Sequence, residues 1–436
     1  MVLNQSQTPL PSMSKQENAT ITARRVGYYC WGGPGTIRMT HVKYFNAKVD
    51  VQSMLSCYDY DTLARVQELF GITDYWVMYS WGFSDEKEAE DRAFLVNRLE
   101  NFKRLGIKVH AYIQGPNLVY DDFKHTDWWA RDEKNRLVTY YRGRRVCSIH
   151  NAGFIDYVSD KIRDTYDLGF DGIYMDNIQH GQLGVPAQPG KLPVVFCGDY
   201  SASAREDFRR ETGHDIPDDL ERDEALTREY LDFRIRSNTR FISHISDIVH
   251  AGDMEFGTNF YDPKFDPAYI YAIDIQKMTT VQDYILFENH ALPANDGNKH
   301  NGYIEEFINQ EEINKPVFVV SYEHGVGMSP QFEQWHLDNL FSEAETSNFN
   351  LCLKGGEFTT DGVWHCLYID DLQPPRRDKK LPRNHVNQEA EALQVALNFR
   401  LFRWILKRVY NPFYRIAFEW RIFRFIVHIV YDTTLK

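Results

Sequence analysis

The stretch "GFDGIYMDN", residues 169–177, contains a short apolar run between two aspartates, Asp171 and Asp176. An apolar run of this length, bounded by glycine and polar residues, predicts a buried β-strand. Residues 154–169, "FIDYVSDKIRDTYDLG", have apolar residues at helical spacing and end in glycine, which predicts a helix that leads into this strand. A helix followed at once by a buried strand is the repeating unit of an α/β fold.

The same alternation recurs along most of the chain. Helical patterns occupy residues 59–71 and 87–106. Seven further strand-like runs begin at Val26, Thr73, Lys108, Glu255, Asp283, Pro316 and Asn350. Eight strands alternating with helices predict a (β/α)8 TIM barrel, which we assign to residues 25–369. A doubly wound open sheet is the alternative, but no GxGxxG motif follows the first strand.

Three segments depart from a minimal barrel. Residues 178–252 are too long for one connection, so we expect a long insertion after the fourth strand that could cover a substrate. Residues 1–24 are polar and lack the apolar core of a signal peptide, which predicts a disordered leader. Residues 370–390 are rich in proline and charge and predict a linker to a C-terminal tail, residues 391–436.

The C-terminal tail differs in charge from the rest of the chain. Residues 397–436 hold eight Lys or Arg but only two Asp or Glu, on an amphipathic helical pattern with Trp404 and Trp420. Such a pattern is typical of a helix pair that lies on an anionic membrane surface. The alternative is that the tail packs on the acidic barrel or on a partner subunit.

Composition narrows the classes of function. The formal net charge of −13 argues against nucleic acid as a partner, because phosphate binding needs a basic surface. The six cysteines are scattered without a CxxC pair, so we expect reduced thiols, no metal and no cofactor. No apolar run is long enough to span a membrane. We therefore expect a cytoplasmic protein, peripheral on the inner membrane face if the tail is an anchor.

The ends of the predicted strands supply the candidate site, because a barrel forms its active site at the C-terminal ends of its strands. Asp171 begins the fourth strand and is expected to be scaffold. Asp176 ends it and, by strand alternation with Tyr174, is expected to point into the barrel. Glu288 is the candidate second carboxylate. The expected substrate-binding residues are Trp31, Trp81, His110, Tyr112, Tyr174, Asn177, Asn259, Tyr261, Asp262, Asn289, His290 and Glu323.

Two stretches carry a resemblance to a known group of enzymes. "LGFDGIYMDNI" resembles the fourth-strand motif of TIM-barrel glycoside hydrolases, and "CGDYSASAREDFRRETGHDIP" resembles the segment that follows it in β-galactosidase- and α-L-fucosidase-like members. The resemblance implies a carbohydrate hydrolase that acts on an oligo- or polysaccharide, with Asp176 as nucleophile. α-Galactosidase-like barrels place the proton donor after the sixth strand, which implies Glu288. We expect a retaining mechanism with these two carboxylates.

Two other functions remain open from the sequence. A metal-dependent hydrolase or deacetylase could use a cluster of His110, Asp176, His180, His290 and His324, although no HxH or HExxH spacing supports it. A non-catalytic barrel could bind glycans and assist polysaccharide synthesis or export at the membrane. Such a barrel would bind sugars without cleaving them.

Overall fold

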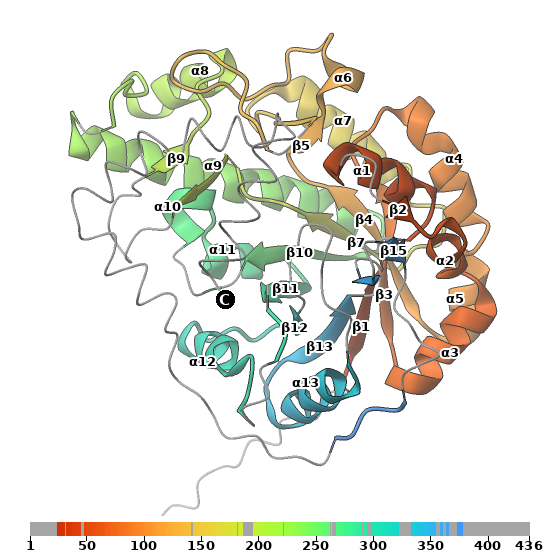
Figure 1. The fold of residues 1–436 in the computed structure, drawn as a ribbon. Coiled ribbons are helices and arrows are strands. Elements are labelled where there is room, and N and C mark those ends of the chain that lie inside the picture. The colour runs from red at the N-terminus through yellow and green to blue at the C-terminus, as the bar shows by residue number, and fades with distance from the viewer. Residues whose placement is uncertain are drawn as a thin grey trace, which may run out of the picture.

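Eight parallel strands form a closed barrel in this computed structural model (Figure 1). The structure describes residues 24–30, 32–44, 48–140, 143–180, 182–185, 195–220, 222–261, 263, 267–289, 291–293, 298–321, 333–354, 358–360, 363–365 and 373–377. The barrel strands are β1 (Val26–Cys30), β3 (Asp74–Ser80), β4 (Lys108–Gln114), β7 (Gly172–Asp176), β10 (Glu255–Tyr261), β11 (Tyr284–Asn289), β12 (Val317–Ser321) and β13 (Asn350–Lys354). All eight predicted strands, and with them the predicted (β/α)8 TIM barrel, are confirmed.

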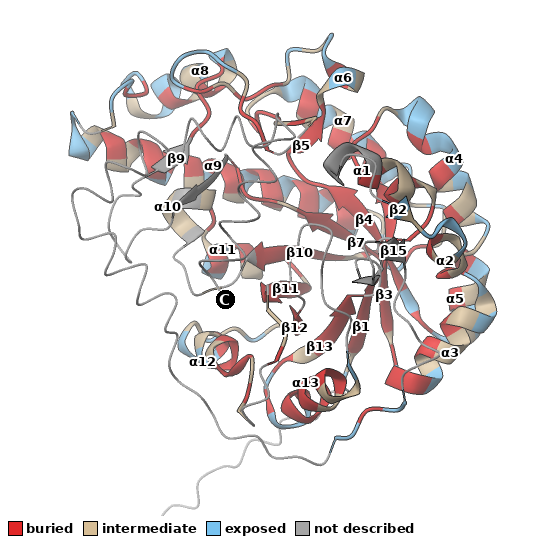
Figure 2. Cartoon of the chain, viewed as in Figure 1, coloured by how far each residue is buried: buried red, intermediate tan, exposed pale blue. Residues whose placement is uncertain are grey.

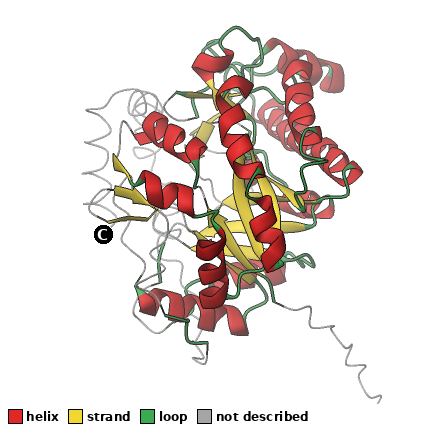
Figure 3. Cartoon of the chain, turned by 90° about the vertical axis from the view of Figure 1, so that its right-hand side faces the viewer, coloured by secondary structure: helices red, strands yellow, loops and turns green. Residues whose placement is uncertain are grey.

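Helices surround this barrel (Figure 3). They are α1 (Pro34–Tyr44), α2 (Val51–Ser56), α3 (Tyr60–Phe70), α4 (Asp85–Val96), α5 (Leu99–Leu105), α6 (Tyr120–Phe123), α7 (Ala152–Arg163), α8 (Ala202–Thr212), α9 (Glu224–Ala251), α10 (Pro267–Tyr271), α11 (Ile275–Thr280), α12 (Gly302–Gln310) and α13 (Gln334–Thr346). The helical pattern at 59–71 is α3. The pattern at 87–106 is divided between α4 and α5, and the pattern at 154–169 forms α7 followed by turns. No helix in the described part of the chain is long and apolar enough to cross a membrane.

Large aromatic rings fill the inside of the barrel. Every second residue of a strand points inward, which brings Tyr29, Trp76 and Tyr284 into one buried cluster. The Trp76 and Tyr284 ring centroids are 5.8 Å apart, and the indole nitrogen of Trp76 donates a hydrogen bond to the Tyr284 hydroxyl at 2.9 Å. A methyl group at Gly27 or Gly257 would overlap one of these rings, so glycine at both positions makes room for them. The strands are accordingly buried along most of their length (Figure 2).

The predicted long insertion after the fourth barrel strand is also confirmed. Between β7 and β10 the chain forms a small antiparallel pair, β8 (Gln182–Val185) and β9 (Val195–Cys197), and then α8 and α9. These two helices have their own apolar cluster, which includes Phe208, Tyr230 and Phe233. The inner face of α9 packs against α7 and β10. The insertion therefore adds a layer to the barrel wall rather than a separate lobe.

The remaining small strands lie outside the barrel. After β4, the chain makes a second excursion that contains the antiparallel pair β5 (Asn117–Val119) and β6 (Arg144–Val146). The fully buried Arg144 side chain ties this pair to the barrel through the carbonyl oxygens of Trp81 and Asn117. A three-stranded sheet joins β2 (Lys48–Val49), β14 (Phe358–Thr360) and β15 (Val363–His365). The sequence did not predict either small sheet.

The predicted terminal segments fall almost wholly outside the described residues. Of the leader only Arg24 is described, and of the linker only residues 373–377. In that short stretch the backbone nitrogens of Gln373 and Arg376 donate hydrogen bonds to Gln334 and Asp338 on α13. The tail, residues 391–436, lies outside the described residues, and its membrane or subunit role stays a prediction.

Candidate active site

Asp176 is the last residue of β7, and its side chain points into the barrel. It is 3% exposed. Its Oδ2 accepts hydrogen bonds from the Tyr112 hydroxyl and from the Asn177 side-chain nitrogen, each at 2.6 Å. Its Oδ1 is buried and has no hydrogen-bond partner among the described residues. One carboxylate oxygen is thus fixed in place, while the other is left available.

The backbone around Asp176 is held unusually close to the neighbouring strand. The Gly115 backbone nitrogen donates to the Asp176 carbonyl oxygen at 2.7 Å, and any side chain at Gly115 would collide with that carbonyl group. Asn177 has a φ of 58°, which is the left-handed region. Non-glycine residues adopt it at an energetic cost, and such strain often accompanies a functional site. Tyr140 and Gln179 contact the Asn177 side chain and hold it in this conformation.

Glu288 lies on the same inner surface as Asp176. It is 6% exposed and shares its inward direction with Tyr284 and Leu286 on β11. One strand, β10, separates β11 from β7, so the two backbones are ~10 Å apart and the inward side chains converge across that gap. Asn259 on β10 donates from its side-chain nitrogen to Glu288 Oε1 at 2.7 Å.

Burial and mutual repulsion change the acidity of these groups. Burial raises the pKa of Asp176 to about 7, and the nearby Glu288 charge adds to the rise. The Tyr112 hydrogen bond and the Lys354 charge oppose it. Burial, with Asp176 and Glu288 adding to it, also raises the pKa of the Tyr174 hydroxyl well above its usual value. The Asp176 carboxyl group therefore titrates near neutral pH.

The structure brings together six of the residues that the sequence singled out: Asp176, Glu288, Tyr112, Tyr174, Asn177 and Asn259. Trp81 adjoins them, with its ring centroid 5.4 Å from that of Tyr112. Asn289 does not join them, because alternation turns it out of the barrel, where it donates to Asn301 at 2.8 Å. Trp31, Asp262, His290 and Glu323 lie outside the described residues, and so does the Tyr261 side chain.

His110 is inward-facing as expected, but it lies at the opposite end of the barrel from Asp176. It pairs in register with Gly172, so Asp176 is four residues further along the strand, ~13 Å away. One ion cannot be bound by both residues, which removes His110 from any metal cluster at Asp176. His180 instead lies 3.6 Å from Asp199 in the insertion, measured from His180 Nε2 to Asp199 Oδ2.

An ion-pair network occupies the end of the barrel where His110 lies. His110 Nε2 is 3.1 Å from Asp74 Oδ1, and Glu255 is close enough that the three could in principle hold a metal ion. However, Arg25 pairs with both Asp74 and Glu255, and its charge helps hold the pKa of Asp74 well below the usual range. A resident arginine makes this cluster a structural network. At the same end, Asp171 accepts a hydrogen bond from the Val109 backbone nitrogen at 2.8 Å, which confirms its scaffold role.

Two residues around Asp176 were not predicted from the sequence, Tyr140 and Tyr29. Tyr140 comes from the unpredicted excursion after β4, and nothing local marks it. Tyr29 alternates with Gly27 on β1 and places its ring 5.5 Å from that of Tyr174, and alternation along β1 is a signal that could have identified it. Lys354, which ends the eighth predicted strand, also lies here, with its buried Nζ 5.6 Å from the centre of the Tyr29 ring.

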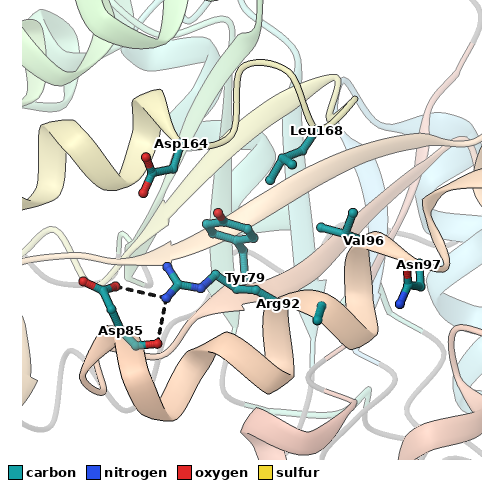
Figure 4. A pocket seen from close by; sticks show the side chains of 8 residues that line it. Tyr79, Asp85, Arg92, Val96, Asn97, Asp164 and Leu168 are labelled. Atoms are coloured by element: carbon teal, nitrogen blue, oxygen red, sulfur yellow. Dashed lines mark hydrogen bonds and ion pairs between the residues drawn. The ribbon is translucent and has the colours of Figure 1, made fainter.

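A cavity of about 740 Å³ lies on the outside of the barrel wall (Figure 4). It is lined by residues of α4 and of the turn before β7, with Tyr79 of β3 as its floor. Arg92 spans it and pairs with Asp85 at 3.1 Å. None of its lining residues belongs to the group around Asp176, so the cavity is separate from the candidate active site.

Comparison with known proteins identifies the fold. No family model matches this sequence, and neither does any curated protein. The β-galactosidase of the haloarchaeon Halorubrum lacusprofundi is similar in structure, with a TM-score of 0.52 and 11% identity over 81% of this chain and 56% of that one. The β-galactosidase of Marinomonas ef1 has a TM-score of 0.50 and 12% identity over 85% and 58%.

An α-L-fucosidase of Paenibacillus thiaminolyticus has a TM-score of 0.49 and 12% identity over 77% of this chain and 46% of that one. This chain thus spans about half the length of these three enzymes. The structural similarity establishes the fold. At sequence identities this low it does not establish the activity, which has to be argued from the site. The chain has the (β/α)8 barrel fold that these glycoside hydrolases share, as the fourth-strand motif predicted.

Proposed function

We propose that this protein hydrolyses glycosidic bonds in an oligo- or polysaccharide, with Asp176 and Glu288 as the two catalytic carboxylates. The observation that carries the proposal is the state of Asp176. Its carboxyl group is buried at the end of a barrel strand, one oxygen is held by two donors, and the other has no partner within the described structure. A buried polar atom without a partner calls for an explanation, and a ligand in the barrel mouth supplies one.

The hydrogen bonds favour Asp176 as the nucleophile. Two donors and the Lys354 charge stabilise the ionised form of Asp176. We therefore assign the nucleophile to Asp176 and the proton to Glu288. Asp176 Oδ1 then attacks the anomeric carbon while Glu288 protonates the departing glycosidic oxygen.

The second half of the reaction restores both groups. Glu288, now ionised, takes a proton from a water molecule, and the resulting hydroxide attacks the anomeric carbon of the sugar bound to Asp176. The bond between that carbon and Asp176 breaks, which releases the sugar with its original anomeric configuration and regenerates both carboxyl groups. Tyr174 lines this space with a buried hydroxyl that has no hydrogen-bond partner in the described chain and is available to a sugar hydroxyl. Trp81 adds an aromatic ring beside Tyr112.

The test is a screen of aryl glycosides and oligosaccharides with wild type, Asp176→Asn and Glu288→Gln. Both substitutions keep the side-chain shape and remove the charge. We expect each variant to lose at least ~100-fold in kcat/KM on the substrate that wild type cleaves, because each removes one chemical role. Asp171→Asn is the matched control, since Asp171 comes directly before the same strand, at the far end of the barrel, and the substitution should leave activity unchanged.

The outcomes separate the alternatives. Proton NMR of the first-formed product gives its anomeric configuration, and inversion would contradict the nucleophilic role of Asp176. Full activity in Asp176→Asn would exclude it from the chemistry. Sugar binding without turnover in wild type would favour a non-catalytic glycan-binding barrel.

A further inference from the structure

The loop that follows β3 is buried, whereas most loops lie on the surface. Trp81 and Phe83 are 4% and 2% exposed, and Gly82 between them is also buried. A buried loop needs partners inside the protein for its backbone N–H and C=O groups. The N–H groups of Trp81 and Phe83 both find their partner in a single side chain, which therefore determines how the loop is held.

That side chain is Glu88, in the first turn of α4 and 1% exposed. Its Oε1 accepts hydrogen bonds from the backbone nitrogens of Trp81 at 2.7 Å and of Phe83 at 3.0 Å. Its Oε2 accepts from the Ser80 hydroxyl at 2.8 Å and from Lys161 Nζ, on α7, at 3.2 Å. One oxygen of Glu88 thus holds the loop, while the other holds the end of β3 and an ion-pair partner.

Arg144 holds the same loop from its other side. Its fully buried guanidinium group donates a hydrogen bond to the Trp81 carbonyl oxygen. Gly82 has a φ of 78°, and a methyl group there would lie 2.9 Å from the side chains of Arg144 and Leu118. The backbone of Trp81 is therefore fixed at its N–H and at its C=O by two buried side chains of opposite charge.

The Trp81 ring connects this loop to the candidate active site. Its centroid lies 5.4 Å from that of Tyr112, whose hydroxyl donates to Asp176 Oδ2 at 2.6 Å. We propose that Glu88 is a positioning residue that holds the Trp81 ring against Tyr112 and thereby keeps the Tyr112 hydroxyl on Asp176. The consequence for catalysis rests on the hydrolase function proposed above.

Two substitutions at Glu88 separate its hydrogen bonds from its charge. Glu88→Gln keeps an oxygen that accepts from Trp81 and Phe83, and Lys161 retains Asp85 as an ion-pair partner at 2.6 Å. Glu88→Met has a similar length but no carboxylate, so the loop loses both bonds. Lys161→Met is the matched control, because it removes the buried ion pair and leaves the loop contacts in place. Should Glu88→Met not fold, as judged by circular dichroism, Glu88→Asp withdraws the carboxylate by one methylene group and gives the same comparison.

The first assay is the kcat/KM of each variant on the glycoside that wild type cleaves. We expect Glu88→Met to lose roughly 10- to 100-fold, the value of the Tyr112 hydrogen bond to a charged acceptor, and Glu88→Gln and Lys161→Met to lose little. Because Glu88 acts through Tyr112, adding Glu88→Met to Tyr112→Phe should cause no further loss. Losses that multiply in the double variant would overturn the proposal. So would a loss in Glu88→Gln or Lys161→Met as large as that in Glu88→Met.

A second measurement does not depend on turnover. The Asp176 carboxyl carbon can be followed by NMR in protein labelled at aspartate and assigned by its absence from Asp176→Asn. It should titrate at higher pH in Glu88→Met than in wild type, because the ionised form has lost a donor, and as in wild type in Glu88→Gln. The other groups that act on this charge, Glu288 on β11, Lys354 on β13 and Asn177 after β7, are the same in all these proteins.

The titration also separates this proposal from the proposed function. An unchanged Asp176 titration in Glu88→Met would contradict the positioning role. If wild type cleaves no glycoside but the titration moves as expected, the proposed hydrolase function fails while the positioning role of Glu88 stands.

Discussion

Replacing Asp176 with asparagine should stabilise the folded protein by an amount that depends on pH. In the folded state the pKa of Asp176 is raised from 3.8 to about 7, chiefly by burial. Between these values the folded protein holds a proton that the unfolded chain has released, so the free energy of unfolding decreases as pH rises through this window. Asp176→Asn has no titrating carboxyl group at this position, so its free energy of unfolding does not decrease for this reason.

The magnitude follows from the size of the shift. About three pKa units, at about 1.4 kcal/mol each, correspond to ~4 kcal/mol of lost stability once the pH exceeds the folded pKa. The advantage of Asp176→Asn over wild type should therefore grow by up to ~4 kcal/mol between pH 4 and pH 8 and level off above that range. The raised pKa of Glu343 acts equally in both proteins, so its contribution cancels in the difference.

Urea denaturation of both proteins at half-unit pH steps measures this difference. Asp171→Asn, whose side chain is exposed, is the control and should track wild type across the range. A difference between Asp176→Asn and wild type that stays constant from pH 5 to pH 8 would refute the reasoning, because it would mean that the Asp176 carboxyl titrates normally in the folded protein.

Two further substitutions test the surroundings. Tyr112→Phe removes a 2.6 Å hydrogen bond that stabilises the ionised form of Asp176, worth about 1.5–3 kcal/mol for a charged acceptor, and should move the acidic limb of the pH–kcat/KM profile up by about one to two units; an unchanged profile would contradict this. Arg25→Leu leaves the fully buried Asp74 without its guanidinium partner and should lower the free energy of unfolding by ~3 kcal/mol in urea titration. Arg65→Leu, at an exposed ion pair, should cost under ~1 kcal/mol, and similar losses in the two would argue against the buried network.

The barrel could be predicted because its strands are buried on both faces. A strand covered by helices outside and by the packed core inside has few polar positions, so all eight stand out as apolar or aromatic runs between helical patterns. The excursion after β4 gave no such signal, because its strands β5 and β6 are only three residues long. Arg144 connects it to the barrel through contacts that are distant in sequence.

The candidate site could be predicted only in part, for a geometric reason. Alternation along a strand states which face a side chain occupies, and this correctly turned both His110 and Asp176 inward. Alternation does not give the position of a side chain along the barrel axis, because that position depends on the register between strands. His110 was therefore assigned to the wrong end of the barrel. The contact between Asn259 and Glu288 likewise depends on two neighbouring strands at once, which no single stretch of sequence encodes.

The aromatic rings inside the barrel affect how a ligand can reach Asp176. Trp76 and Tyr284 pack against Gly27 and Gly257 and close the barrel at the end opposite Asp176. As far as the described residues show, a molecule at Asp176 therefore has to enter and leave at the end of the barrel opposite these rings. In the two-step reaction proposed above, the departing first product and the incoming water would then pass through the same end of the barrel. The packed rings would thus make release of the first product a condition for entry of water.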